Sequence, residues 1–172
     1  MKTIGSAIIM LVLTPSLFAD NGKELKLTSP DGTHEIAFYQ KQVSPAVNEL
    51  CYRVDYKSQP VVNESRAGLE LDNRIWEMAL GARNLKQPAC WMDNLEVDSV
   101  TYQPETDITW QPLYGERSSV RDHYRTGTLY LSKKDNSGYR LNIEVRAYNE
   151  GVAFRYFFPE HPKAIFHKVV GD

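Results

Sequence analysis

Hydrophobic and polar side chains alternate along most of the chain after residue 24, with a repeat of two residues. A repeat of two is the spacing of a β-strand that buries one face, as strands of antiparallel sheets do. The segments that show it are residues 25–27, 36–39, 50–56, 69–71, 97–102, 123–132, 141–147 and 152–158, and a further short strand is expected to start at residues 61–62. The pattern therefore predicts an all-β protein, built from antiparallel strands as a sandwich or a barrel.

Turn-forming residues separate these segments. Ser29-Pro30-Asp31-Gly32 is a strong turn signal, because proline fixes φ at its position and glycine accepts conformations that other residues resist. Further turns are predicted at residues 58–60, 133–138 and 148–151. The last of these reverses the chain within a hairpin over residues 146–156, which the pattern marks as architectural, with Arg146 and Arg155 on its polar face and Glu144 or Glu150 balancing them.

Other parts of the chain depart from the alternation. Pro104 is expected to end the strand that precedes it, and residues 105–122 are rich in polar and aromatic groups without clean periodicity. Residues 78–85 are either a helical turn or an irregular connection. A further strand is expected to start at Val169-Val170, so that the sandwich is incomplete at the C-terminal end of this chain.

The N-terminal segment has the pattern of a secretory signal peptide. Lys2 supplies a positive charge, residues 4–13 are mostly apolar, and Leu17-Phe18-Ala19 offers a cleavage site that ends in a small residue. The alternative is a membrane anchor, but the apolar run falls short of the roughly 20 residues that span a bilayer. We therefore expect a signal peptide over residues 1–19, and a secreted or periplasmic protein over residues 20–172 with no membrane segment after cleavage.

Charge and motif searches exclude several classes of function. The formal net charge is −2 and no dense cluster of lysine and arginine occurs, so nucleic-acid binding is not expected. The four histidines show no paired spacing, and the chain has no zinc, EF-hand, phosphate-loop or GxSxG pattern. Cys51 and Cys90 either form a disulfide, as an oxidising compartment would allow, or are two buried thiols. The spacing of only two cysteines does not distinguish a disulfide from free thiols.

The most informative segment for function is Trp110-Gln111-Pro112-Leu113-Tyr114-Gly115-Glu116-Arg117. Flat aromatic faces stack on sugar rings, so Trp110 and Tyr114 are candidate carbohydrate contacts, with Glu116 and Arg121 as hydrogen-bonding partners. The alternative is a structural aromatic corner held by Arg–Glu pairs. Nearby acids, including Asp107 and Asp122, are either solvated surface groups or the facing carboxylate pair that a glycosidase needs.

Four blocks of the sequence resemble the N-terminal domain of glycoside hydrolase family 97, the bacterial α-glucosidases and α-galactosidases. The blocks are SPDG at residues 29–32, YRVDY at 52–56, WQPLYGE at 110–116 followed by RDHY at 121–124, and RAYNEGVAFRY at 146–156. The last two are fairly specific. The resemblance covers most of the chain after the signal peptide.

The resemblance implies an antiparallel β-super-sandwich of the galactose-mutarotase-like kind, followed in the full-length enzyme by a catalytic (β/α)₈ barrel that this chain lacks. It also implies a calcium ion and an oligosaccharide substrate for the full-length enzyme. No catalytic residue and no metal ligand of the family transfers to a position here. We therefore expect a scaffolding, sugar-contacting domain that is inactive alone; the alternatives are a free-standing secreted carbohydrate-binding module and an assembly module without a ligand.

Overall fold

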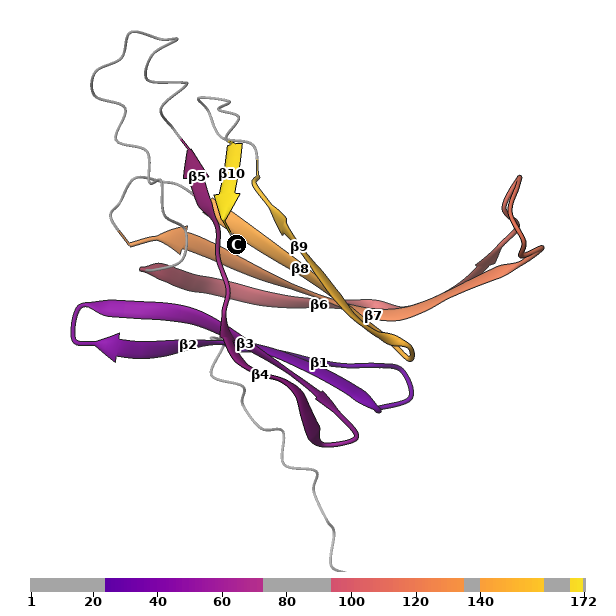
Figure 1. Ribbon diagram of the computed structural model, residues 1–172, viewed down its shortest axis with the longest axis horizontal. Helices are drawn as coiled ribbons and strands as arrows, with labels where there is room; N and C mark the ends of the chain where they lie inside the picture. The colour runs from indigo at the N-terminus through magenta and orange to yellow at the C-terminus, as the bar shows by residue number, and fades with distance from the viewer. Residues whose placement is uncertain (1–23, 73–93, 135–139, 160–167, 172) are drawn as a thin grey trace, which may run out of the picture.

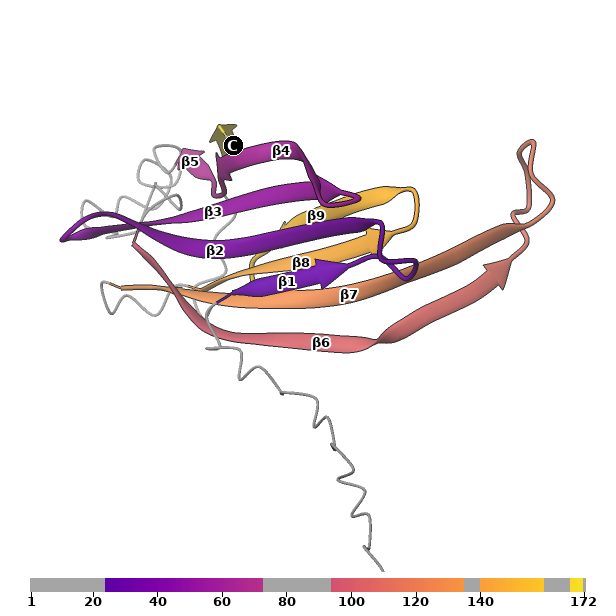
Figure 2. The same cartoon turned by 90° about the horizontal axis from the view of Figure 1, so that it is seen from below.

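Two four-stranded antiparallel sheets face each other in this protein, and a two-stranded sheet accompanies them (Figures 1 and 2). The computed structural model describes residues 24–72, 94–134, 140–159 and 168–171. All regular secondary structure within these ranges is β-strand. The predicted all-β, antiparallel sandwich is therefore confirmed.

Each large sheet is an uninterrupted meander, in which every strand pairs with the next along the chain. The N-terminal sheet has the order β1 (Leu25–Thr28), β2 (His34–Ser44), β3 (Val47–Tyr56) and β4 (Gln59–Arg66). The C-terminal sheet has the order β6 (Leu95–Trp110), β7 (Val120–Lys133), β8 (Arg140–Tyr148) and β9 (Gly151–Phe157). The two-stranded sheet joins β5 (Glu70–Asp72) to β10 (Lys168–Gly171).

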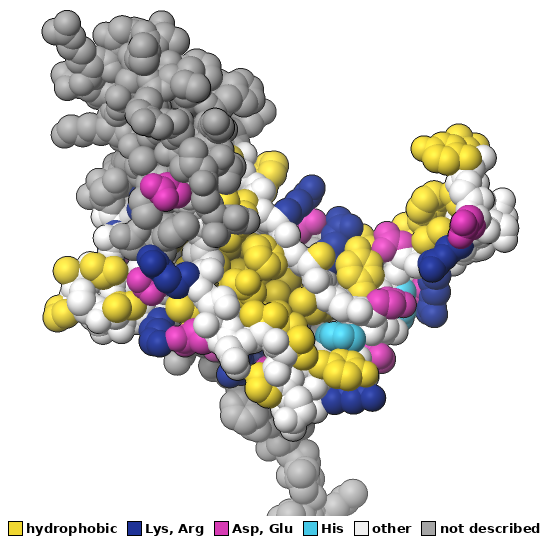
Figure 3. Space-filling model, viewed as in Figure 1, with side chains coloured by type: hydrophobic (Ala, Val, Ile, Leu, Met, Phe, Trp, Pro, Cys, Tyr) yellow, Lys and Arg dark blue, Asp and Glu magenta, His cyan; other side chains and the backbone are white. Residues whose placement is uncertain are grey.

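The hydrophobic core lies between the two large sheets, and the side chains predicted to point inward form it. Phe38, Leu129 and Ile143 are completely buried, and they come from β2, β7 and β8. The core also includes Leu25, Leu27, Ile36, Leu50, Val54, Leu95, Val97, Leu131, Leu141, Val145 and Ala147. Figure 3 shows hydrophobic side chains gathered between the two sheets. Tyr52, Phe154 and Tyr156 are partly buried and pack against the core.

Pro104 does not end its strand. β6 continues from Leu95 to Trp110, and its pairing with β7 shifts register between Gln103 and Thr106. A proline is tolerated here because the strand lies at an edge of its four-stranded sheet and the bulge sets two residues, Pro104 and Glu105, opposite the single residue Arg125. The prediction that residues 105–122 are irregular is therefore wrong for 105–110 and 120–122, which are strand.

The turn between β3 and β4 lies earlier than predicted. Lys57 and Ser58 both have positive φ, of 47° and 62°. Two central residues with positive φ make the tight connection whose twist matches that of an antiparallel hairpin. Gln59 and Pro60 consequently begin β4 rather than forming the turn.

Two turns that lie far apart in the sequence join one large sheet to the other. The backbone amide of Asp31, in the turn between β1 and β2, donates a 3.0 Å hydrogen bond to Oδ1 of Asn149, in the turn between β8 and β9. Arg125 of β7 reaches the same turn, donating to Thr28 Oγ1 at 3.3 Å and to the Pro30 carbonyl at 3.5 Å. We call this contact the inter-sheet clasp.

Several predictions fall on residues that the structure does not describe. They concern the signal peptide, the helical turn at residues 78–85, most of the loop at 133–138, and Cys90. Cys51 is a buried free cysteine, and its pairing with Cys90 stays a prediction. Among the described residues, no helix is long and apolar enough to cross a membrane.

Candidate functional site

The predicted site residues lie on a two-stranded arm that extends from the C-terminal sheet. β6 and β7 stay paired as far as Trp110 and Val120, whereas β8 pairs with β7 only from Tyr124 onward. Residues 105–123 therefore form a hairpin that has no third strand beside it among the described residues. Figures 1 and 2 show this arm projecting well beyond the rest of the sandwich.

Apolar and aromatic side chains are exposed at the end of the arm. Trp110 is 50% exposed, Tyr114 89% and Leu113 99%. Figure 3 shows this hydrophobic group separated from the hydrophobic side chains of the core. Gly115 has a φ of 119°, which a residue with a side chain rarely adopts, and this helps the loop reverse direction. Large exposed aromatic surfaces of this kind are typical of binding sites rather than of free surface.

One face of the arm carries a ladder of alternating charges. Arg121 makes a bidentate pair with Asp107, with Nε to Oδ1 at 2.7 Å and Nη2 to Oδ2 at 2.6 Å. Glu105 accepts from Arg125 Nε at 2.9 Å and lies 2.7 Å from His123 Nε2. These hydrogen bonds lower the pKa of Asp107 and of Glu105. The ladder links two strands that have no third strand beside them in the part of the chain that the structure describes.

The structure brings together some of the predicted site residues and separates others. Trp110 and Arg121 lie in adjacent register positions near the end of the arm. Arg121 pairs with Asp107 and not with Glu116, which makes no hydrogen bond or ion pair with any described residue. The Arg–Glu corner is thus replaced by an Arg–Asp pair, and Glu116 is left exposed in the loop.

The acids of the arm do not form the facing pair that a glycosidase uses. Asp107 lies opposite His123 and Ile108 lies opposite Asp122. Because side chains alternate between the faces of a strand, Asp107 and Asp122 point to opposite faces of the arm. Across the ranges described above, no group of three or more His, Cys, Asp or Glu side chains converges to hold a metal ion. These residues consequently do not fit the calcium ion that the family resemblance implies for the full-length enzyme.

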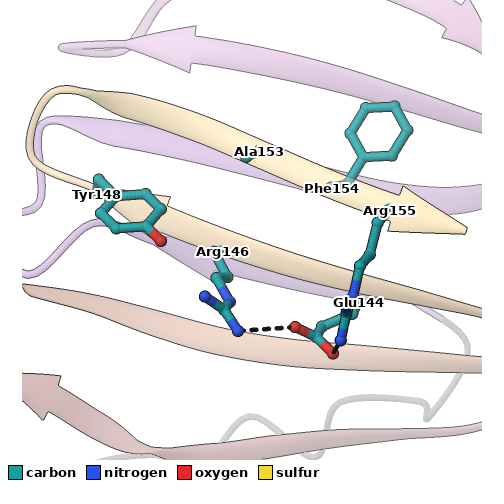
Figure 4. Close-up of a pocket in the computed structure, with 6 residues that line it drawn as sticks. All are labelled: Glu144, Arg146, Tyr148, Ala153, Phe154 and Arg155. Carbon is teal, nitrogen blue, oxygen red and sulfur yellow. Dashed lines mark hydrogen bonds and ion pairs between the residues drawn. The ribbon is translucent and has the colours of Figure 1, made fainter. Parts of the chain in front are cut away.

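A second candidate lies on the outer face of the C-terminal sheet, the face turned away from the N-terminal sheet. A cavity of about 250 Å³ is lined there by Glu144, Arg146, Tyr148, Ala153, Phe154 and Arg155. Figure 4 shows the three residues of β8 and Arg155 of β9 on this face, while Phe154 points the other way. We call this cavity the outer pocket.

Ion pairs and an aromatic ring fix the charged groups of the outer pocket. Glu144 accepts from Arg155 Nη2 at 2.7 Å through Oε2, and its Oε1 lies 3.2 Å from Arg146 Nη2. The Arg146 guanidinium lies over the Tyr124 ring, 4.6 Å from its centroid. The hydrogen bond from Arg155 and the charges of both arginines lower the pKa of Glu144, so its carboxylate is ionised at neutral pH.

The sequence predicted the pairing in the outer pocket but not the pocket itself. Glu144 forms ion pairs with Arg146 and Arg155, as expected for the polar face of this hairpin. The alternation of Glu144, Arg146 and Tyr148 places them on one face of β8. Only the register of β8 with β9, which sets Glu144 opposite Arg155, shows that the charges converge.

Comparison with known proteins identifies the family. The family model described as glycosyl-hydrolase 97 N-terminal matches residues 27–171. A retaining alpha-galactosidase of Bacteroides thetaiotaomicron is 26% identical over 156 residues, which is 91% of this chain and 19% of that protein. The chain thus spans about a fifth of the length of this curated relative.

Solved structures give the same result. A glycoside hydrolase family 97 enzyme of Pseudoalteromonas sp. strain K8, solved with panose and also with acarbose, has a TM-score of 0.66 and 25% identity. That match covers 84% of this chain and 19% of the enzyme. A beta-arabinopyranosidase shares the fold, with a TM-score of 0.64, 19% identity and coverage of 85% and 20%. The chain belongs to the N-terminal domain family of glycoside hydrolase family 97.

Proposed function

We propose that this chain is the sugar-contacting, scaffolding domain of an exported α-glycosidase, and that its arm helps form the substrate site against a catalytic barrel. One observation carries the proposal: the arm holds Trp110 and Tyr114 exposed, far from the core of their own domain. A sandwich that acted only as a spacer would gain nothing from aromatic side chains held in water.

The relatives support the proposed substrate class. One is a retaining alpha-galactosidase, and another was solved with panose and with acarbose. We therefore propose that α-linked oligosaccharides are the substrates of the full-length enzyme. The catalytic carboxylates would lie in the barrel, because the acids of the arm do not face each other across a common space. Calcium, where the full-length enzyme binds it, would be held outside the described residues of this chain.

The hydrolysis of 4-nitrophenyl α-glucoside and α-galactoside by the complete gene product tests this proposal. DNA beyond codon 172 should encode a barrel. Replacing both aromatics, Trp110→Ala with Tyr114→Ala, should lower kcat/KM by about tenfold, since stacking on the substrate or on the barrel wall is lost. The control is Val61→Ala, which shortens an apolar side chain on β4 whose exposure, 66%, lies between those of Trp110 and Tyr114.

Two outcomes would overturn the proposal. One is a gene without a barrel; the other is an active enzyme in which the arm variant and the Val61→Ala control have the same kcat/KM. If the gene lacks a barrel, titration of the folded chain with maltooligosaccharides tests the remaining candidate, a free-standing carbohydrate-binding module. The exposure of Tyr114 favours that candidate equally, whereas the resemblance in sequence and structure to much longer enzymes favours the first.

A further inference from the structure

The outer pocket has an uncompensated positive charge. Two guanidinium groups, of Arg146 and Arg155, share the single carboxylate of Glu144. The residues paired across the strands with Glu144 and Arg146 on the β7 side are Thr128 and Thr126, which are neutral. Among the residues that line the pocket, two positive charges therefore meet one negative charge.

Hydrogen-bond donors in the pocket also exceed acceptors. Both oxygens of Glu144 already receive a guanidinium group. Arg155 is 66% exposed and uses only Nη2, so Nε and Nη1 have no partner among the described residues. A guanidinium presents its donors as a planar fork that fits the two oxygens of a carboxylate. A ligand that supplies hydrogen-bond acceptors, and above all a carboxylate with its two oxygens, would therefore complement the unpaired donors of Arg155.

Aromatic groups form one wall of the pocket. The Tyr148 ring lines it and packs on Tyr124, with 5.1 Å between ring centroids. Arg146 is held in place by its contact with the Tyr124 ring and by its ion pair with Glu144. Arg146 is thus positioned before any ligand arrives, while Arg155 at the rim keeps free donors.

The volume of the outer pocket limits the size of its ligand. At about 250 Å³ it lies below the range, from roughly 300 Å³ upward, of sites for drug-sized molecules. That space suits one six-membered sugar ring.

We propose that the outer pocket binds a single carboxylate-bearing sugar residue, a uronate. The carboxylate pairs with the free edge of the Arg155 guanidinium, and the sugar ring lies against Tyr148. The inference rests on the proposed function in one respect: a saccharide is taken as the carrier of the carboxylate. The outer pocket is separate from the arm, whose aromatic side chains are assigned to the α-linked substrate.

Titration of the full chain by heteronuclear NMR tests this site. The probes are D-galacturonate and D-glucuronate, the neutral sugars D-galactose and D-glucose, and acetate. At least one uronate should bind about tenfold more tightly than its neutral counterpart and than acetate, and should shift the amide signals of β8 and β9. Binding should weaken with added NaCl, because the attraction is between exposed charges.

Variants assign the effect to Arg155. Arg155→Gln should weaken uronate binding by about tenfold, and Arg155→Lys should restore part of it, because a lysine keeps the charge but loses the fork. The matched control is Arg66→Gln, another exposed strand arginine that pairs with a single glutamate, Glu49. Circular dichroism melts of each variant show whether the fold is kept. Tyr148→Phe keeps the ring and serves as a second, milder change.

Each remaining outcome counts against the proposal. Equal binding of a uronate and its neutral sugar would overturn the recognition of the carboxylate. Equal binding of acetate and uronate would overturn the recognition of a sugar, and no binding by the folded chain would overturn both. The proposed function fails independently, since its readout is hydrolysis and its variants lie on the arm; uronate binding would stand even if no hydrolysis were found.

Discussion

Asp31 organises the turn between β1 and β2 through its carboxylate. Oδ1 accepts hydrogen bonds from Ser29 Oγ at 2.6 Å, from the Thr33 amide at 3.0 Å and from Thr33 Oγ1 at 2.8 Å. The pKa of Asp31 is lowered to about 2, chiefly by the hydrogen bond from Ser29 and next by the one from the Thr33 amide. The backbone amide of the same residue donates to Asn149 Oδ1 across the inter-sheet clasp, so the turn and the joining of the sheets meet at Asp31.

Asp31→Asn is therefore expected to lower the stability of the fold at pH 7. The folded-state pKa lies below the ordinary value of about 3.9, so the stabilisation is fully present above pH 4 and is lost as the pH falls toward 2. Urea unfolding should give a higher free energy of unfolding for the wild type than for the variant at pH 7, and this difference should become smaller below pH 4. Asp122→Asn is the control, because that carboxylate makes no hydrogen bond or ion pair with a described residue. A gap that stays constant from pH 7 to pH 2 would contradict the assignment.

Individual residues also show how far the sequence could predict this structure. Period-two alternation identified Leu129, Leu131 and Ile143 as core, because burial of one strand face is a local property of the pattern. It missed the strand after Pro104, because a proline is compatible with a strand only where tertiary structure supplies an edge and a bulge. Local pattern thus determines which face is buried, while the position of a strand within its sheet decides its length.

The approach of β7 to β1 depends on the absence of a side chain at Gly127. A Cβ at this position would lie 3.1 Å from Leu25 Cδ1 and 3.4 Å from Tyr102 Cδ1. Leu25 is completely buried and so has little room to move. Gly127→Ala should therefore destabilise the fold by about 1–3 kcal/mol, although alanine is otherwise the better strand residue by roughly 0.5–1 kcal/mol.

A double-mutant cycle measured by urea unfolding checks this contact. Leu25→Val shortens the side chain that the new methyl group would meet, so the pair Gly127→Ala and Leu25→Val should be less destabilised than the sum of the single changes. Leu27→Val, on the same face of β1, gives the reference, and its combination with Gly127→Ala should be additive. Additivity in both pairs would show that the sheets do not meet at Gly127 and Leu25.

The arm is the element with the least support, and its charge ladder replaces a core. Arg121→Gln removes the bidentate pair with Asp107. Amide hydrogen exchange should then speed up across residues 105–123, while the buried strand β8 keeps its protection. Raising the salt concentration should speed exchange in the wild-type arm in the same direction, since these charges are exposed. Unchanged exchange in the arm would mean that the backbone ladder alone holds it.

At the scale of the whole molecule, the sequence predicted the class of fold and the family better than the site. The blocks SPDG and RAYNEG contribute to the family resemblance, and the structure places both in the inter-sheet clasp, where they serve folding. The outer pocket needed the register between β8 and β9, which no local pattern encodes. The exposure of Trp110 and Tyr114 likewise follows from the projection of the arm, which depends on where β8 ends.

Export is the remaining prediction for the chain as a whole. If residues 1–19 are a signal peptide, the protein isolated from the periplasm or medium of a bacterial host should begin at Asp20. Intact mass spectrometry and N-terminal sequencing measure this directly. Ala19→Arg should block cleavage, because the processing site requires a small residue at its last position, and the uncleaved protein should then stay with the membrane fraction. Ser16→Arg, outside the cleavage tripeptide, adds the same charge and should still be processed. An unprocessed wild-type protein recovered from the cytoplasm would contradict export, and with it the proposal that the parent enzyme meets its oligosaccharides outside the cell.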